Sequence, residues 1–165
     1  MVELGWPAYC GTNRVCYGFI WFVILNTSPI TYRIFTNENL LLSKVQGAVT
    51  FQNIVSNIYN LRADPNYSQG MNSFYDLTLC SNIDGDLNKL SEFGDLINDD
   101  MAIKNKCKTA ILIPDDNQII FRLVQGMVLM SSKSNIEHAF FKKANRHLAY
   151  QFLNCSQQII VEIEK

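Results

Sequence analysis

Three polar side chains, Asp76, Thr78 and Ser81, are the best candidates for chemistry in this chain. Asp76 lies near the carboxyl end of a strand predicted over Met71–Thr78, and ligands of open α/β sheets bind outside such ends. An aspartate there can also simply cap the following loop. A phosphate on Thr78 or Ser81 would add about two negative charges among nearby carboxylates and could release a partner. We therefore take these three as candidate regulatory or partner-contact residues, with ordinary loop groups as the alternative.

Cys80 is the candidate nucleophile, because it follows the same strand and precedes a predicted helix. A helix N-terminus in that position can lower the pKa of a thiol. A catalytic cysteine also needs a base, and the two histidines, His138 and His147, lie far along the chain. His138 alternates with apolar residues of a predicted strand, and His147 lies in a basic stretch. A buried, inert Cys80 is the expectation, and a cysteine-dependent enzyme is the weaker alternative.

No motif in the sequence marks a metal, a cofactor or a catalytic centre. Neither a glycine-rich phosphate loop after a predicted strand nor a nucleophile elbow is present. The cysteines form no Cys-x-x-Cys pair and have no histidine at metal-ligand spacing. They are Cys10, Cys16, Cys80, Cys107 and Cys155. We expect no metal, no cofactor and no catalytic residue, and so a protein that is not an enzyme.

The composition restricts the class of partner. The chain has 14 Lys and Arg against 15 Asp and Glu over 165 residues, without the basic excess that nucleic-acid binders carry. Nucleic acid is therefore not an expected partner. Scattered cysteines in a chain large enough for a good core indicate reduced thiols and a cytoplasmic protein.

The apolar run Val15–Leu25 sets residues 1–29 apart as an N-terminal extension of uncertain status. The run is shorter than the roughly 20 apolar residues of a membrane-spanning helix. Its length suits a signal peptide, but the flanking residues fit one poorly. Three interpretations stay open: an extension outside the domain, an extra element packed on it, and a signal or anchor. Only the last would make the protein exported or membrane-associated.

Residues 30–165 form the predicted domain, in which strands and helices alternate. Strands are predicted over 30–34, 40–46, 71–78, 108–113 and 135–141, and the tail at 159–163 suggests one more. Helices are predicted from Thr50, from Asp86, around 120–128 and over 144–153. Gly47 should end the second strand, and Asn37–Asn39 should join the first two as an antiparallel hairpin. The order predicts an α/β domain with a mixed sheet whose later crossovers are parallel.

Several short motifs give the domain a family resemblance. They are Thr31-Tyr32 in the first strand, Gly47-Ala48-Val49-Thr50 before the helix, Asp64-Pro65-x-Tyr67-x-x-Gly70, Tyr75-Asp76-Leu77, and the closing Leu148-Ala149-Tyr150-Gln151-Phe152-Leu153. In these, and over about Ile30–Leu153, the chain resembles the SpoIIAA-like family of small bacterial proteins, relatives of the STAS domain. Phe152 stands where that family's terminal helix has a tryptophan.

The resemblance implies a fold and a class of function. It implies a mixed β-sheet of four to five strands with helices packed mainly on one face. STAS relatives include anti-sigma-factor antagonists that are switched by phosphorylation of a serine in an Asp-Ser-Ser-Gly motif. That motif is absent here, although Ser81 lies nearby. The fold also resembles lipid-transfer domains of the CRAL-TRIO type.

The expected function is that of a non-enzymatic binding or regulatory module with a protein partner, in a bacterial cytoplasm. The alternative is a carrier of a lipid or another apolar small ligand. Met101, Met127, Met130, Phe93 and Phe121 could line its pocket or form plain core. Edge strands and the apolar N-terminus invite pairing into a homodimer. Membrane association is not expected unless Val15–Leu25 is an anchor.

Overall fold

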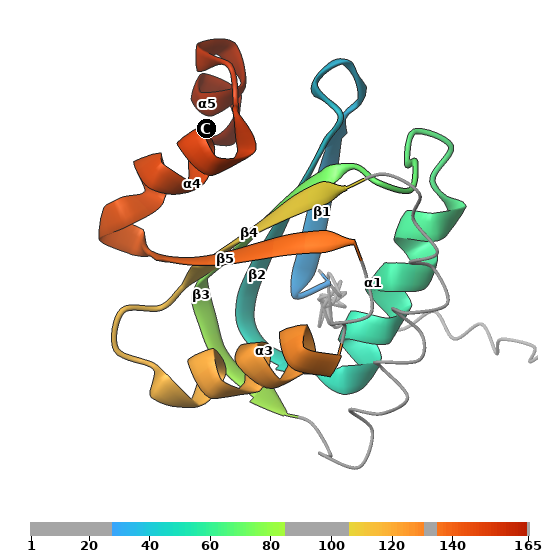
Figure 1. Ribbon diagram of the computed structural model, residues 1–165. Coiled ribbons are helices and arrows are strands. Elements are labelled where there is room, and N and C mark those ends of the chain that lie inside the picture. The colour runs from blue at the N-terminus through green and yellow to red at the C-terminus, as the bar shows by residue number, and fades with distance from the viewer. Residues whose placement is uncertain (1–27, 85–105, 131–134, 165) are drawn as a thin grey trace, which may run out of the picture.

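One mixed sheet of five strands organises the chain in the computed structural model, which describes residues 28–84, 106–130 and 135–164. The strands lie side by side in chain order (Figure 1). They are β1 (Ile30–Phe35), β2 (Leu40–Thr50), β3 (Asn72–Asp84), β4 (Cys107–Ile113) and β5 (Ile136–Lys142). The β1–β2 pair is antiparallel and the other three pairs are parallel. The predicted α/β class, opening hairpin and parallel crossovers are confirmed.

The hairpin turn and the length of β2 depend on two residues with positive φ. A short 3-10 turn, Thr36–Glu38, leads to Asn39 in the left-handed region at φ 49°, a conformation that asparagine tolerates well. Gly47, at φ 72°, lies where the β2–β3 register shifts, and the strand continues to Thr50. The prediction that Gly47 ends the strand is therefore wrong, because the glycine permits an irregularity within the strand.

Four helices accompany the sheet in the described residues: α1 (Phe51–Ala63), α3 (Gln118–Met130), α4 (Arg146–Leu153) and α5 (Gln157–Ile163). Thr50 caps α1 as predicted, and it forms a reciprocal capping box with Asn53. Asp64 before Pro65 is extended and ends α1. The helix predicted from Asp86 and the apolar run Val15–Leu25 lie outside the described residues.

The C-terminal tail differs from the prediction. Residues 159–163 form part of helix α5, whose N-terminus is capped by Ser156, and not a further strand. Ile159 and Ile163 are both buried. Their spacing of four fits a helix as well as it fits the two-residue repeat of a strand, so apolar alternation alone misassigned the tail.

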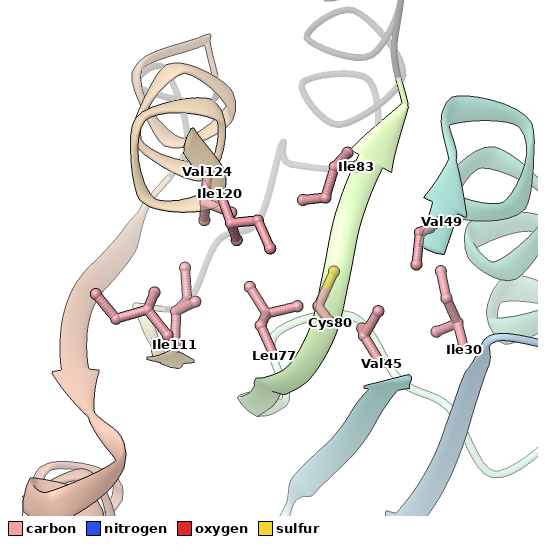
Figure 2. Close-up of a cluster of buried hydrophobic side chains, with 10 residues drawn as sticks. Ile30, Val45, Val49, Leu77, Cys80, Ile83, Ile111, Ile120 and Val124 are labelled. Atoms are coloured by element: carbon pink, nitrogen blue, oxygen red, sulfur yellow. The ribbon is translucent and has the colours of Figure 1, made fainter. Parts of the chain in front are cut away.

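Helices cover both faces of the sheet (Figure 1). On the first face, below called the α1–α3 face, buried residues from β1 to β4 pack with Ile120 and Val124 of α3. Figure 2 shows these two side chains pointing from the helix toward Leu77 and Ile111. Val45, Val49 and Ile30 continue the same cluster toward α1.

The opposite, α4–α5 face has a second core of equal size. Leu40, Leu42, Phe74 and Leu112 pack there with residues of α4 and α5, and the Phe74 and Tyr150 rings stack at 5.4 Å. The helices are thus divided between the faces and do not pack mainly on one. The cause lies in the strands, which carry large apolar side chains on both sides and need two covering layers.

Candidate functional site

The structure places Asp76, Thr78 and Ser81 inside one long strand. β3 extends to Asp84, so Asp76 lies in its middle, beside Lys44 of β2 and Leu112 of β4. The predicted location at the carboxyl end of a strand is wrong for Asp76. Thr78 and Ser81 do not lie in a loop or at a helix start, although Ser81 is exposed. Two register shifts between β2 and β3 carry the pairing past Thr78.

Asp76 belongs to a polar network that joins the sheet to the terminal helices. One carboxylate oxygen accepts hydrogen bonds from the Thr78 backbone at 3.0 Å and hydroxyl at 2.6 Å. The other pairs with Arg146 Nη2 at 2.5 Å. Arg146 Nη1 lies 3.2 Å from a Glu164 oxygen, and the Tyr150 hydroxyl donates to the other Glu164 oxygen. Asp76 is only 7 % exposed, whereas the Glu164 side chain is 46 % exposed, so the network runs from the buried centre of the sheet to the surface and ties the two together.

Two lysines of the sheet hold the last turns of the same helices. Lys44 Nζ donates to the Ile163 carbonyl at 3.0 Å, and Lys108 Nζ donates to the Phe152 carbonyl at 3.0 Å. Helix C-termini carry unpaired carbonyls and partial negative charge, which a cation satisfies. The α4–α5 face is therefore fastened to the sheet by polar contacts around its apolar centre, and the sequence did not reveal them.

Thr78 lines an open polar cleft of about 410 Å³ beyond the end of β4. Asp115, Asp116, Asn117 and Lys143 also line it. A phosphate on Thr78 would share the cleft with Asp115 and Asp116, which would repel it, and with Lys143, which would attract it. The Thr78 hydroxyl already donates to Asp76, so it is engaged in the structure.

Cys80 is buried, as the sequence led us to expect. It is 4 % exposed and its thiol donates to the Asn82 carbonyl at 3.5 Å. Burial raises the pKa of the Cys80 thiol, and a protonated thiol is a poor nucleophile. His147 is exposed on α4. The cysteine-dependent alternative gains no support from this arrangement.

A second concave feature of the described residues is a mainly apolar, partly open cavity of about 220 Å³ between the sheet and helices α1 and α3. The strands form the floor of the cavity, and helices α1 and α3 and the loop before β3 form its walls. The floor includes Ile30, Leu41, Val45, Leu77 and Ile111. The walls include Ile54, Ile58 and Leu61 of α1, Val124, Met127 and Val128 of α3, and Tyr67 and Met71 of the loop. The lining is mainly apolar.

The predicted pocket residues behave differently from one another. Met127 lines the cavity as expected. Phe121 packs edge-on against Phe140, and Met130 is exposed. Phe93 and Met101 lie outside the described residues.

A polar row crosses the floor of this cavity. Ser73 of β3 pairs with Thr109 of β4, and Thr109 pairs with His138 of β5. All three side chains line the cavity. The sequence places His138 among apolar residues of a predicted strand, and it singles out neither Ser73 nor Thr109. The sequence signal that could have revealed the row is one polar residue at a cavity-facing position in each of three mainly apolar strands.

The environment of the cavity favours the neutral forms of the titratable side chains that line it. Burial raises the pKa of Tyr75 to about 12, and Tyr67 adds to the effect. Burial also raises the pKa of the Cys107 thiol and lowers the pKa of His138. Each shift favours the neutral form. The described residues that line the cavity include no Lys, Arg, Asp or Glu.

Within the described ranges, no group of three or more His, Cys, Asp or Glu residues is arranged to hold a metal ion. A search of the same ranges for a helix with the length and apolar character to span a membrane found none.

Comparisons of the chain with protein-family models, with curated proteins and with solved structures found no match. The SpoIIAA-like resemblance therefore stays a prediction from the motifs.

Proposed function

We propose that this protein is a non-enzymatic binding module that holds a small apolar molecule between its sheet and helices α1 and α3. The observation that carries the proposal is the cavity of about 220 Å³ with its mainly apolar lining. A well-formed apolar pocket with a few convergent polar groups is the usual form of a small-molecule site. Of the functions expected from the sequence, the carrier now leads.

The energetic argument is that an unoccupied apolar pocket leaves its lining without packed neighbours. A ligand that fills the space supplies those dispersion contacts. It also covers apolar surface that otherwise faces water, which is worth about 25 cal/mol per Å².

The volume also limits the ligand. An apolar cavity of about 150 Å³ binds benzene. By proportion, 220 Å³ suits a molecule of roughly nine non-hydrogen atoms. A single-ring compound or a short chain fits this size.

Native mass spectrometry of protein purified gently from its own host tests the proposal. We expect the wild type to retain a small molecule and a Val128→Phe variant, in which a ring enters the cavity, to lose it. Leu129→Phe is the matched control, because Leu129 lies next in α3 and is 72 % exposed. A wild type that retains no small molecule, or a variant that retains it equally well, would contradict the proposal.

A protein partner is the second candidate function, and the far half of β3 favours it. β4 pairs with β3 only over Ser73–Asp76. Beyond these residues Leu79 is 61 % exposed and lies near exposed Ser81. In the same experiment, a stoichiometric protein that Leu79→Asp releases and Val128→Phe retains would establish this function. A phosphate found on Ser81 would add the regulatory switch.

Two further expectations belong to the proposal. The opening antiparallel hairpin and mixed sheet support the SpoIIAA-like resemblance. The free thiols of Cys80, Cys107 and Cys155 support a reducing compartment such as the cytoplasm, and the expectation of a bacterial protein rests on the resemblance alone.

A further inference from the structure

The polar row of Ser73, Thr109 and His138 makes the cavity selective for one class of ligand. We infer that the ligand is uncharged and carries a single hydroxyl or carbonyl group, which hydrogen-bonds to this row, and that the matching carboxylate is rejected. The inference rests on the proposed function and names the chemistry of the same site.

The position of the row is fixed by strand pairing. Ser73, Thr109 and His138 lie on adjacent strands at paired positions, and neighbouring strands run about 4.8 Å apart. The three side chains therefore form a short polar line on a mainly apolar floor, to which Ser43 and Tyr75 add further polar groups. Thr109, at its centre, is 6 % exposed. One polar group of a ligand can reach two of these side chains at once.

The types of side chain define the hydrogen bonds on offer. A serine or threonine hydroxyl both donates and accepts, and a neutral imidazole has one donor and one acceptor nitrogen. Burial lowers the pKa of His138, which favours the neutral ring. Ser73 also hydrogen-bonds to Tyr75, and His138 to the Ile136 backbone, so the Thr109 hydroxyl is the group of the row best placed to serve an alcohol or a carbonyl. A pure hydrocarbon would leave the row without a ligand partner.

A carboxylate finds no countercharge among the described residues that line the cavity. The described lining holds no Lys or Arg, and a buried ion without a partner loses its hydration with little in return. Three cations near the centre of the sheet make their contacts on the opposite, α4–α5 face. Lys44 and Lys108 donate to the ends of α5 and α4, and Arg146 pairs with Asp76.

Three probes built on one ring test the inference: p-xylene, 4-methylbenzyl alcohol and 4-methylbenzoate, titrated at pH 7.5 by calorimetry. We expect the alcohol to bind at least about tenfold more tightly than the carboxylate. Thr109→Val, which keeps the shape and removes the hydroxyl, should weaken the alcohol about five- to tenfold and leave p-xylene unchanged. Ser73→Ala serves the same purpose if Thr109→Val does not fold.

The outcomes separate the two proposals. Carboxylate binding as tight as that of the alcohol, or alcohol binding that neither variant weakens, would overturn the inference and leave the cavity as a binding site. Failure of all three probes to bind would count against the proposed function itself. Val128→Phe is the control for location, and it should abolish binding of every probe.

Discussion

At the scale of single residues, Asp76 has a structural task. It is almost fully buried, accepts two hydrogen bonds from Thr78 and pairs with Arg146. Removing one partner of a buried pair leaves the other charge uncompensated, which costs more than the pair itself contributes. Asp76 therefore holds α4 against β3 and is not free to contact a partner.

We predict that Asp76→Asn destabilises the fold by about 2–3 kcal/mol, because the Arg146 guanidinium loses its closest carboxylate. Urea unfolding measures this change. Arg33→Gln is the control. Arg33 Nη2 lies 3.6 Å from Glu162 Oε2, and the Arg33 side chain is 55 % exposed. Such surface ion pairs contribute about 0.5 kcal/mol. Equal effects of the two substitutions would contradict a structural role for Asp76.

The residue scale also shows what the sequence could not provide. Asp76 was misplaced because the register shifts that lengthen β3 leave no mark in local composition. Ser73, Thr109 and His138 were missed as a group because their proximity depends on pairing between three strands distant in sequence. Cys80 was predicted correctly, because an isolated thiol in an apolar setting is ordinarily buried.

At the scale of elements, two glycines allow a matched test of backbone geometry. A Cβ at Gly47 or at Gly126 would meet nothing within 4 Å, so packing is the same for both. They differ in conformation: Gly47 has φ 72° in β2, and Gly126 lies within helix α3. Only the first conformation is unfavourable to a residue with a Cβ.

We predict opposite effects for the two alanine substitutions. Gly47→Ala should destabilise the fold by about 1 kcal/mol, since the side chain is strained at positive φ. Gly126→Ala should stabilise it by about 0.5–1 kcal/mol through higher helix propensity. Thermal or urea unfolding of both variants decides; a neutral or stabilising Gly47→Ala would show that β2 does not need the left-handed residue.

Local signals predicted most of the elements. The polar turn before Leu40, the cap at Thr50 and the Asp64-Pro65 stop each act within a few residues, and the structure confirms all three. The prediction of a strand in the tail was wrong, because the spacing of Ile159 and Ile163 suits a helix as well as a strand. Only their packing against the sheet decides between the two structures. The second covering layer, α4 and α5, follows from apolar residues on both faces of the strands, which a one-face expectation overlooks.

At the scale of the whole molecule, the cavity should make the protein sensitive to pressure. Unfolding eliminates internal voids, so pressure favours the unfolded state in proportion to their volume. We predict that Val128→Phe lowers the magnitude of the unfolding volume change on the order of 20 mL/mol, while Leu129→Phe leaves it unchanged. High-pressure fluorescence measures both, and equal volume changes in the two variants would mean that the ring does not enter the cavity.

The sequential strand order has a consequence for synthesis on the ribosome. Each strand that emerges finds its neighbour already present, so the sheet can assemble from the N-terminal side as translation proceeds. The cover of the α4–α5 face is the last described part to emerge. Until then Leu40, Leu42, Phe74 and Leu112 present a bare apolar sheet. This face of the nascent protein is therefore open to chaperones, and to aggregation, until α4 and α5 leave the exit tunnel.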